Sequence, residues 1–118
     1  MPGARMRRVN GAVREVISAH ISGDLKDPRI GFVTVTGVET SPDLRNARVF
    51  VSVLGNEAER ADALAGLSAA AGFLQAQIGR ELRMKRTPTL SFVYDESVDT
   101  GMRISKLLDE GKPSEPGS

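Results

Sequence analysis

Positively charged side chains gather in two short stretches of the sequence. Residues 80–86 hold four bases against one acid, and residues 5–14 hold four arginines and no acid. Guanidinium and ammonium groups donate charge-assisted hydrogen bonds to phosphate oxygens, so clustered bases are what a nucleic-acid-binding protein places against the backbone. The sequence therefore predicts phosphate contacts by eight residues: Arg80, Arg83, Lys85, Arg86, Arg5, Arg7, Arg8 and Arg14.

A second interpretation of these bases needs no ligand. Cations in the last turn of a helix complement the helix dipole, and lysine and arginine are common on protein surfaces. This accounts for Arg80 and Arg83, and less well for the bases that follow them or for the N-terminal arginines. The formal net charge is only +1, but the acids gather elsewhere, at 57–62 and 95–99. Such segregation permits a basic face on a nearly neutral protein.

The residue types give little support for a catalytic site or a metal site. The chain has no cysteine, which excludes disulfides, zinc–thiolate sites and thiol catalysis. Its only histidine, His20, lies beside an apolar helical stripe and is interpreted as structural. Asp95, Glu96 and Asp99 lack the ligand pattern of a calcium loop, and no phosphate-binding glycine motif is present. We therefore predict no enzymatic activity, no cofactor, no metal and no small-molecule substrate.

The overall composition narrows the protein class further. Aromatic residues make up 4% of the chain, too few for a surface of stacked aromatic rings that reads RNA bases. There is no apolar run of about 18 residues for a membrane span, and no apolar stretch of the signal-peptide kind. The 118 residues are enough for one domain with its own core. We expect a cytoplasmic protein without membrane contact.

Hydrophobic periodicity shows which elements must position the bases. It predicts a helix, two strands joined by a tight turn, a long broken helix, a third strand and a short last helix. The corresponding ranges are 6–21, 30–38, 45–54, 56–86, 90–94 and 102–108, with the turn at 39–44. The domain is expected to span 5–108, and residues 109–118 are expected to be a disordered tail.

The long helical segment carries its own start and break signals. Asn56 and Glu59 have the spacing of a capping box, and Asp99 or Thr100 is positioned to cap the last helix. The run 68–71 of small residues leads into Gly72, where we expect the helix to break. The apolar faces of the elements should meet in one core formed by Val13, Val16, Ile17, Val49, Val51, Leu74, Ile78 and Phe92.

The order of elements is that of a type II KH domain, in which a helix–break–helix unit carries a GXXG loop that clamps the nucleic-acid backbone. This chain has Ala70-Ala71-Gly72 at that place. With this substitution the sequence resembles the ribosome-binding factor A family over residues 5–108. The resemblance rests on short stretches in family order: 7–9, 27–31, 33–36, 41–44, 47–53, 70–74, 82–85, 88–92 and 101–104.

The resemblance implies a KH-like α+β fold, with a three-stranded sheet covered by helices on one face and a kink at Ala70 and Gly72. It implies a non-catalytic, monomeric factor that binds 16S rRNA in the immature 30S subunit. There the factor would assist late maturation and 5′-end processing, including in the cold. An alternative from the residues alone is a protein-interaction module that docks on a ribosomal protein without RNA contact.

Overall fold

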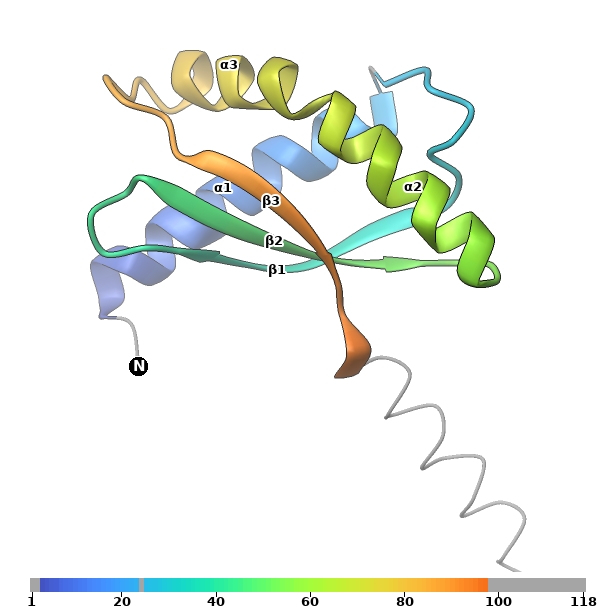
Figure 1. Cartoon of the computed structure of the whole chain (residues 1–118). Helices are drawn as coiled ribbons and strands as arrows, with labels where there is room; N and C mark the ends of the chain where they lie inside the picture. The colour runs from blue at the N-terminus through green and yellow to red at the C-terminus, as the bar shows by residue number, and fades with distance from the viewer. Residues whose placement is uncertain (1–2, 24, 98–118) are drawn as a thin grey trace, which may run out of the picture.

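The structure of the chain, a computed structural model, describes residues 3–23 and 25–97 (Figure 1). The predicted helix at 102–108, its cap at Asp99 or Thr100, and the tail at 109–118 lie outside the described residues. In the described part the elements follow the predicted order, which confirms the α+β class. They are α1 (Ala4–Gly23), β1 (Val33–Thr40), β2 (Asn46–Val53), α2 (Glu57–Ala69), α3 (Ala71–Glu81) and β3 (Thr89–Tyr94).

The three strands form one mixed sheet in the order β1-β2-β3. β1 runs antiparallel to β2, as expected for two strands joined by the turn at 41–45. β3 pairs parallel to β2, with Asn46 opposite Thr89 and Val51 opposite Tyr94. The parallel pairing places the start of β3 beside the start of β2, at the same end of the sheet as the β1–β2 turn.

β1 begins three residues later than the sequence predicted. The carboxylate of Asp27 accepts hydrogen bonds from the backbone and side chain of Arg29, and the amide of Ile30 donates to the carbonyl of Asp27. These bonds hold Ile30 in a turn, where its side chain packs against Gly66 of α2. Ile30 therefore anchors the loop before β1 on α2, and pairing with β2 starts only at Val33.

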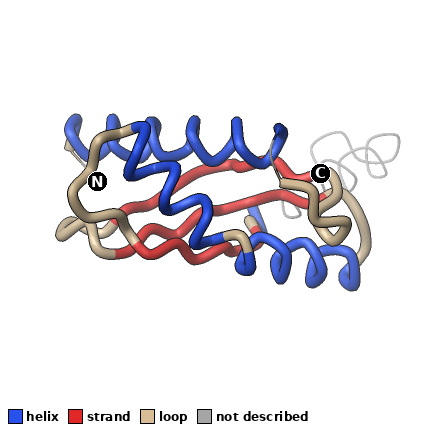
Figure 2. Tube along the Cα trace, turned by 90° about the horizontal axis from the view of Figure 1, so that it is seen from above, coloured by secondary structure: helices blue, strands red, loops and turns tan. Residues whose placement is uncertain are grey.

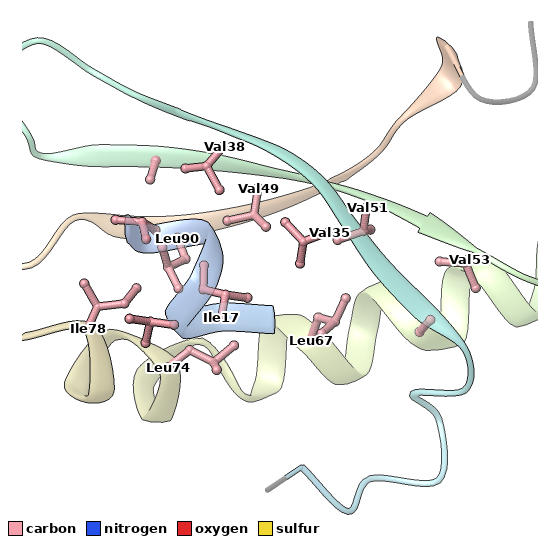
Figure 3. Packing of buried hydrophobic residues seen from close by; sticks show 14 residues of the cluster. Ile17, Val35, Val38, Val49, Val51, Val53, Leu67, Leu74, Ile78 and Leu90 are labelled. Atoms are coloured by element: carbon pink, nitrogen blue, oxygen red, sulfur yellow. The ribbon is translucent and has the colours of Figure 1, made fainter. Parts of the chain in front are cut away.

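All three helices cover one face of the sheet, and the core lies between the two layers (Figure 3). Alternation along β2 sends Val49 and Val51 inward to meet Ile17, Leu74 and Ile78. Seven of the eight predicted core residues are buried. Phe92 is only half-buried, whereas Leu90, two residues earlier on the same face of the edge strand β3, is buried.

The long helical segment breaks at Ala70, one of the two residues expected to form the kink, and not at Gly72. Ala70 is the one residue between α2 and α3, with φ −88° and ψ −1°, and its amide still donates to the carbonyls of Gly66 and Leu67. Gly72 lies in the first turn of α3, exposed, where an added Cβ would meet no atom within 4 Å. Because the backbone at the bend keeps its helical hydrogen bonds, no residue in the left-handed conformation is needed there, and an alanine can occupy the position. Figure 2 shows the resulting change of direction from α2 to α3.

The start of α2 confirms the predicted capping box. The side chain of Asn56 accepts from the amide of Glu59 at 2.9 Å, and the amide of Asn56 donates to the Glu59 carboxylate at 3.1 Å. His20 also has the structural position expected for it. Its Nε2 lies 2.5 Å from a carboxylate oxygen of Glu81, and its ring meets Phe73 edge-on, so it ties α1 to α3.

Candidate nucleic-acid interface

Three segments that are far apart in the sequence lie at one end of the molecule (Figure 1). They are the first turns of α1, the β1–β2 turn, and the connection between α3 and β3. The amide of Thr89 donates to the carbonyl of Arg45 at 2.8 Å, which joins the connection to the turn. We call this the basic end, defined by Arg5, Arg7, Arg8, Arg45, Arg80, Arg83, Lys85 and Arg86.

The turn also contacts α1. Leu44 takes a left-handed conformation, with φ of 62°, and its amide donates to the carbonyl of Ser41. Leu44 and Pro42 then line a hollow of about 350 Å³ together with Arg5, Met6 and other residues of the first turns of α1. The three basic segments are thus held against one another by the turn.

α3 ends at Glu81, five residues earlier than the predicted end at 86. Arg83 follows the C-cap Leu82 in a left-handed conformation, with φ of 53°, and the amide of Met84 donates to the carbonyl of Gly79. This is the Schellman pattern that commonly closes a helix, with arginine where glycine is usual. Only Arg80 therefore lies in the last helical turn, and the helix-dipole interpretation does not account for the bases after it.

The α3–β3 connection is anchored on both sides of its basic residues. Leu82 and Met84 pack against the core, and Pro88 is fully buried. A Cβ added to Gly79 would lie 2.7 Å from the methyl carbon of Thr87, so the connection folds closely over α3. The exposed side chains between these anchors are presented on a short segment with a fixed path.

The eight bases predicted from the sequence are all exposed. Within the described part of the chain, none of them makes a side-chain hydrogen bond or ion pair, whereas Arg29 and Arg48 are held by Asp27 and Glu39. Their charges are therefore available to a ligand. Arg14 lies farther along α1 than Arg5, Arg7 and Arg8, two helical turns beyond Arg7 and on the same side of the helix.

The structure does not bring the kink residues to the basic end. Ala70 and Gly72 begin α3, and Arg83 follows its other end. The eleven residues of α3 separate them by about 16 Å. Any contact made by the kink would therefore belong to a different part of the surface.

Arg45 is the one base of this end that sequence reasoning missed. Its position is set by the turn and by the parallel pairing of β3, which no local pattern indicates. Hydrogen bonds from the Ser41 hydroxyl and then from the Arg45 amide lower the pKa of Asp43, so this carboxylate stays ionised. It lies 3.8 Å from Nε of Arg45 and partly offsets that charge.

Other kinds of site find no support in the described residues. Among residues 3–23 and 25–97, no group of three or more His, Asp or Glu side chains could hold a metal ion. No helix in the same ranges has the length and apolar character needed to cross a membrane.

Comparison with known proteins points to one family. The family model of ribosome-binding factor A matches residues 5–108. A ribosome-binding factor A from Anaeromyxobacter sp. (strain K) is 55% identical over 109 residues, which cover 92% of this chain and 79% of that protein.

Two structures of ribosome-binding factor A, one from a crystal and one a fitted homology model, have the same fold. The crystal structure of ribosome-binding factor A from Thermus thermophilus is 30% identical, with a TM-score of 0.67, over 75% of this chain and 94% of that one. A homology model of the factor from the same species, fitted into the cryo-EM map of its complex with the 30S subunit, is 31% identical. Its TM-score is 0.62, over 74% of this chain and 91% of that one.

Proposed function

The chain belongs to the ribosome-binding factor A family, and on this premise we propose that it binds the small ribosomal subunit through its basic end. The partner is the immature 30S subunit, and the contacts are made to phosphates of 16S rRNA. The bound protein assists late maturation and 5′-end processing of that RNA, including in the cold. The names of its relatives and the 30S complex of the Thermus thermophilus factor support this choice of partner.

One observation carries the RNA contact. Exposed bases from three distant segments meet at one end, and all but Arg45 among them are unpaired within the described residues. Such a concentration of positive charge attracts a polyanion and releases its counterions on binding. The role is one of binding, and the type II KH-like assignment stays a prediction.

The dependence of binding on salt tests this proposal. Changing Arg83 and Lys85 together to Gln removes two charges and leaves polar side chains in their place. Affinity for immature small subunits should fall, and the slope of log affinity against log salt should shrink by about 1.4–1.8, because each neutralised phosphate contributes roughly 0.7–0.9. Sedimentation binding at several salt concentrations measures the slope.

Lys26 provides the matched control. It is exposed like Lys85, and it lies away from the basic end in the loop before β1. Lys26→Gln should leave both the affinity and the salt slope unchanged. If the Arg83/Lys85 variant folds normally and keeps the wild-type slope, the RNA contact does not lie at the basic end, and docking on a ribosomal protein becomes the better function.

A further inference from the structure

Two large apolar side chains stand in solvent at the other end of the sheet. Phe32 is 79% exposed and Leu54 is 75% exposed, the highest values for large hydrophobic residues in the described part of the chain. Val33 pairs with Val53, and the amide of Leu54 donates to the carbonyl of Phe32 at 3.1 Å. Continuing this register by one residue places Phe32 opposite Leu54. Their side chains are then close enough for one partner side chain to contact both.

This apolar pair lies far from the basic end. β2 begins beside the turn that forms the basic end, and Leu54 follows its last residue, Val53. Eight residues of strand separate the two by about 25 Å. Phe32 directly precedes β1 and Leu54 directly follows β2, and Figure 1 shows the start of β1 and the end of β2 next to the start of α2.

The rim of the apolar pair is acidic. A hollow of about 130 Å³ beside Leu54 is lined by Glu59 and Asp62, and Glu57 is exposed in the same first turns of α2. The guanidinium of Arg29 lines the same hollow and attracts Asp62, so it offsets part of this negative charge, although it is also held by Asp27 at 2.6 Å. Carboxylates repel a phosphate backbone, which makes RNA a poor occupant of this surface.

The backbone beneath the pair is well fixed. The loop before Phe32 is anchored by the side chain of Ile30. This side chain packs so closely on α2 that a Cβ added at Gly66 would lie 2.7 Å from it. The segment after Leu54 is fixed by the capping box of Asn56 and Glu59. A rigid apolar surface loses little conformational freedom on docking.

We propose that Phe32 and Leu54, with the rim of Glu57, Glu59 and Asp62, dock a basic protein whose apolar side chain is flanked by lysine or arginine. Exposed apolar patches with a polar rim are the usual form of a protein-docking surface. The inference rests on the proposed function, because the partner is a protein of the same subunit whose RNA the basic end contacts. The two ends then hold one subunit through two chemically different contacts.

Photocrosslinking from each end tests the inference. p-Benzoylphenylalanine replaces Leu54 in one variant and Lys85 in another, and each variant is irradiated in complex with immature small subunits. After nuclease digestion, the probe at position 54 should remain joined to a protein of the subunit, and the probe at position 85 should carry RNA fragments. An RNA adduct at 54, or no protein adduct at 54 in complexes that give the RNA adduct at 85, overturns the docking surface. No RNA adduct at 85 counts instead against the proposed function.

A double substitution gives an independent measurement. Phe32→Ser with Leu54→Ser should weaken subunit binding by about fivefold or more, because truncated interface anchors commonly cost that much. The salt slope should stay at the wild-type value, since no phosphate contact is lost. Val93→Ser is the control, because Val93 is also partly exposed and lies on β3. Unchanged affinity of the folded double variant, or a reduced salt slope, contradicts the inference.

Discussion

Arg83, one of the bases of the candidate RNA surface, holds a backbone conformation that favours glycine, with φ of 53°. An L-residue in this region is strained by roughly 1–2 kcal/mol. The cluster of bases was predictable from the sequence, but this conformation was not, because the usual indicator, a glycine after the helix, is absent. A strained residue in a binding surface is a frequent mark of function.

We predict that Arg83→Gly stabilises the protein while weakening its function. Relief of the left-handed strain should raise the free energy of unfolding by roughly 1 kcal/mol. Loss of the charge should lower affinity for small subunits. Urea unfolding and sedimentation binding measure the two effects, and Arg83→Gln is the control, because it removes the charge and keeps the strain. A glycine variant no more stable than the glutamine variant would contradict this account.

Asp27 should contribute to stability in a pH-dependent way. Hydrogen bonds from the Arg29 side chain, and then from its amide, lower the pKa of Asp27 below its ordinary value of 3.8. A folded pKa below the unfolded one gives stability that is present above the unfolded pKa and is lost as pH falls through the folded pKa. Urea unfolding from pH 7 to pH 2 should therefore show a flatter acid limb for Asp27→Asn than for the wild type. Arg29→Gln should flatten it too, and equal steepness in all three proteins would rule out this pair as the cause.

At the scale of elements, periodicity located every helix and strand of the described part, and capping chemistry located the start of α2. The first and last residues of these helices and strands were less predictable. β1 starts late because Ile30 packs on α2, and α3 stops at Glu81 because the next residues turn back over Gly79. Both ends are set by contacts between segments, which a local pattern does not contain.

Two helical glycines should respond in opposite directions to alanine. At Gly66 a Cβ would lie 2.7 Å from Ile30 and 3.2 Å from Asp27, so the loop before β1 must shift, and we expect a loss of about 1–3 kcal/mol. At Gly72 the space is open and the backbone is helical, so alanine should stabilise by up to about 1 kcal/mol. Thermal and urea unfolding of both variants measure this. A loss at Gly72 as large as that at Gly66 would show that Gly72 matters to the break after all.

At the scale of the whole molecule, charge is divided between two ends. The sequence showed two basic stretches, but it did not show that they meet, because that depends on the parallel pairing of β2 with β3. The opposite end carries the apolar pair and the acids of α2. A net charge of +1 conceals this division.

The meeting of the two basic stretches predicts additive salt effects. Arg7→Gln and Lys85→Gln should each reduce the salt slope of subunit binding by roughly 0.7–0.9, and the double variant should reduce it by the sum. Both side chains are exposed and unpaired within the described residues, so stability should change little. Binding titrations over a range of salt give the three slopes. If Arg7→Gln has no effect while Lys85→Gln does, only the α3–β3 connection contacts RNA.

The bond between Thr89 and Arg45 has a consequence for a chain that leaves the ribosome from its N-terminus. α1 and the β1–β2 hairpin can form early, because their contacts are near in sequence. The connection with Arg83, Lys85 and Arg86 reaches its place only after β3 has paired with β2, which requires residues up to Tyr94. Until β3 has emerged, the bases of the α3–β3 connection remain apart from those of α1 and the β1–β2 turn. The surface proposed for RNA is therefore completed only when β3 pairs with β2, so an unfinished chain presents only part of the charge with which the finished protein would compete for subunits.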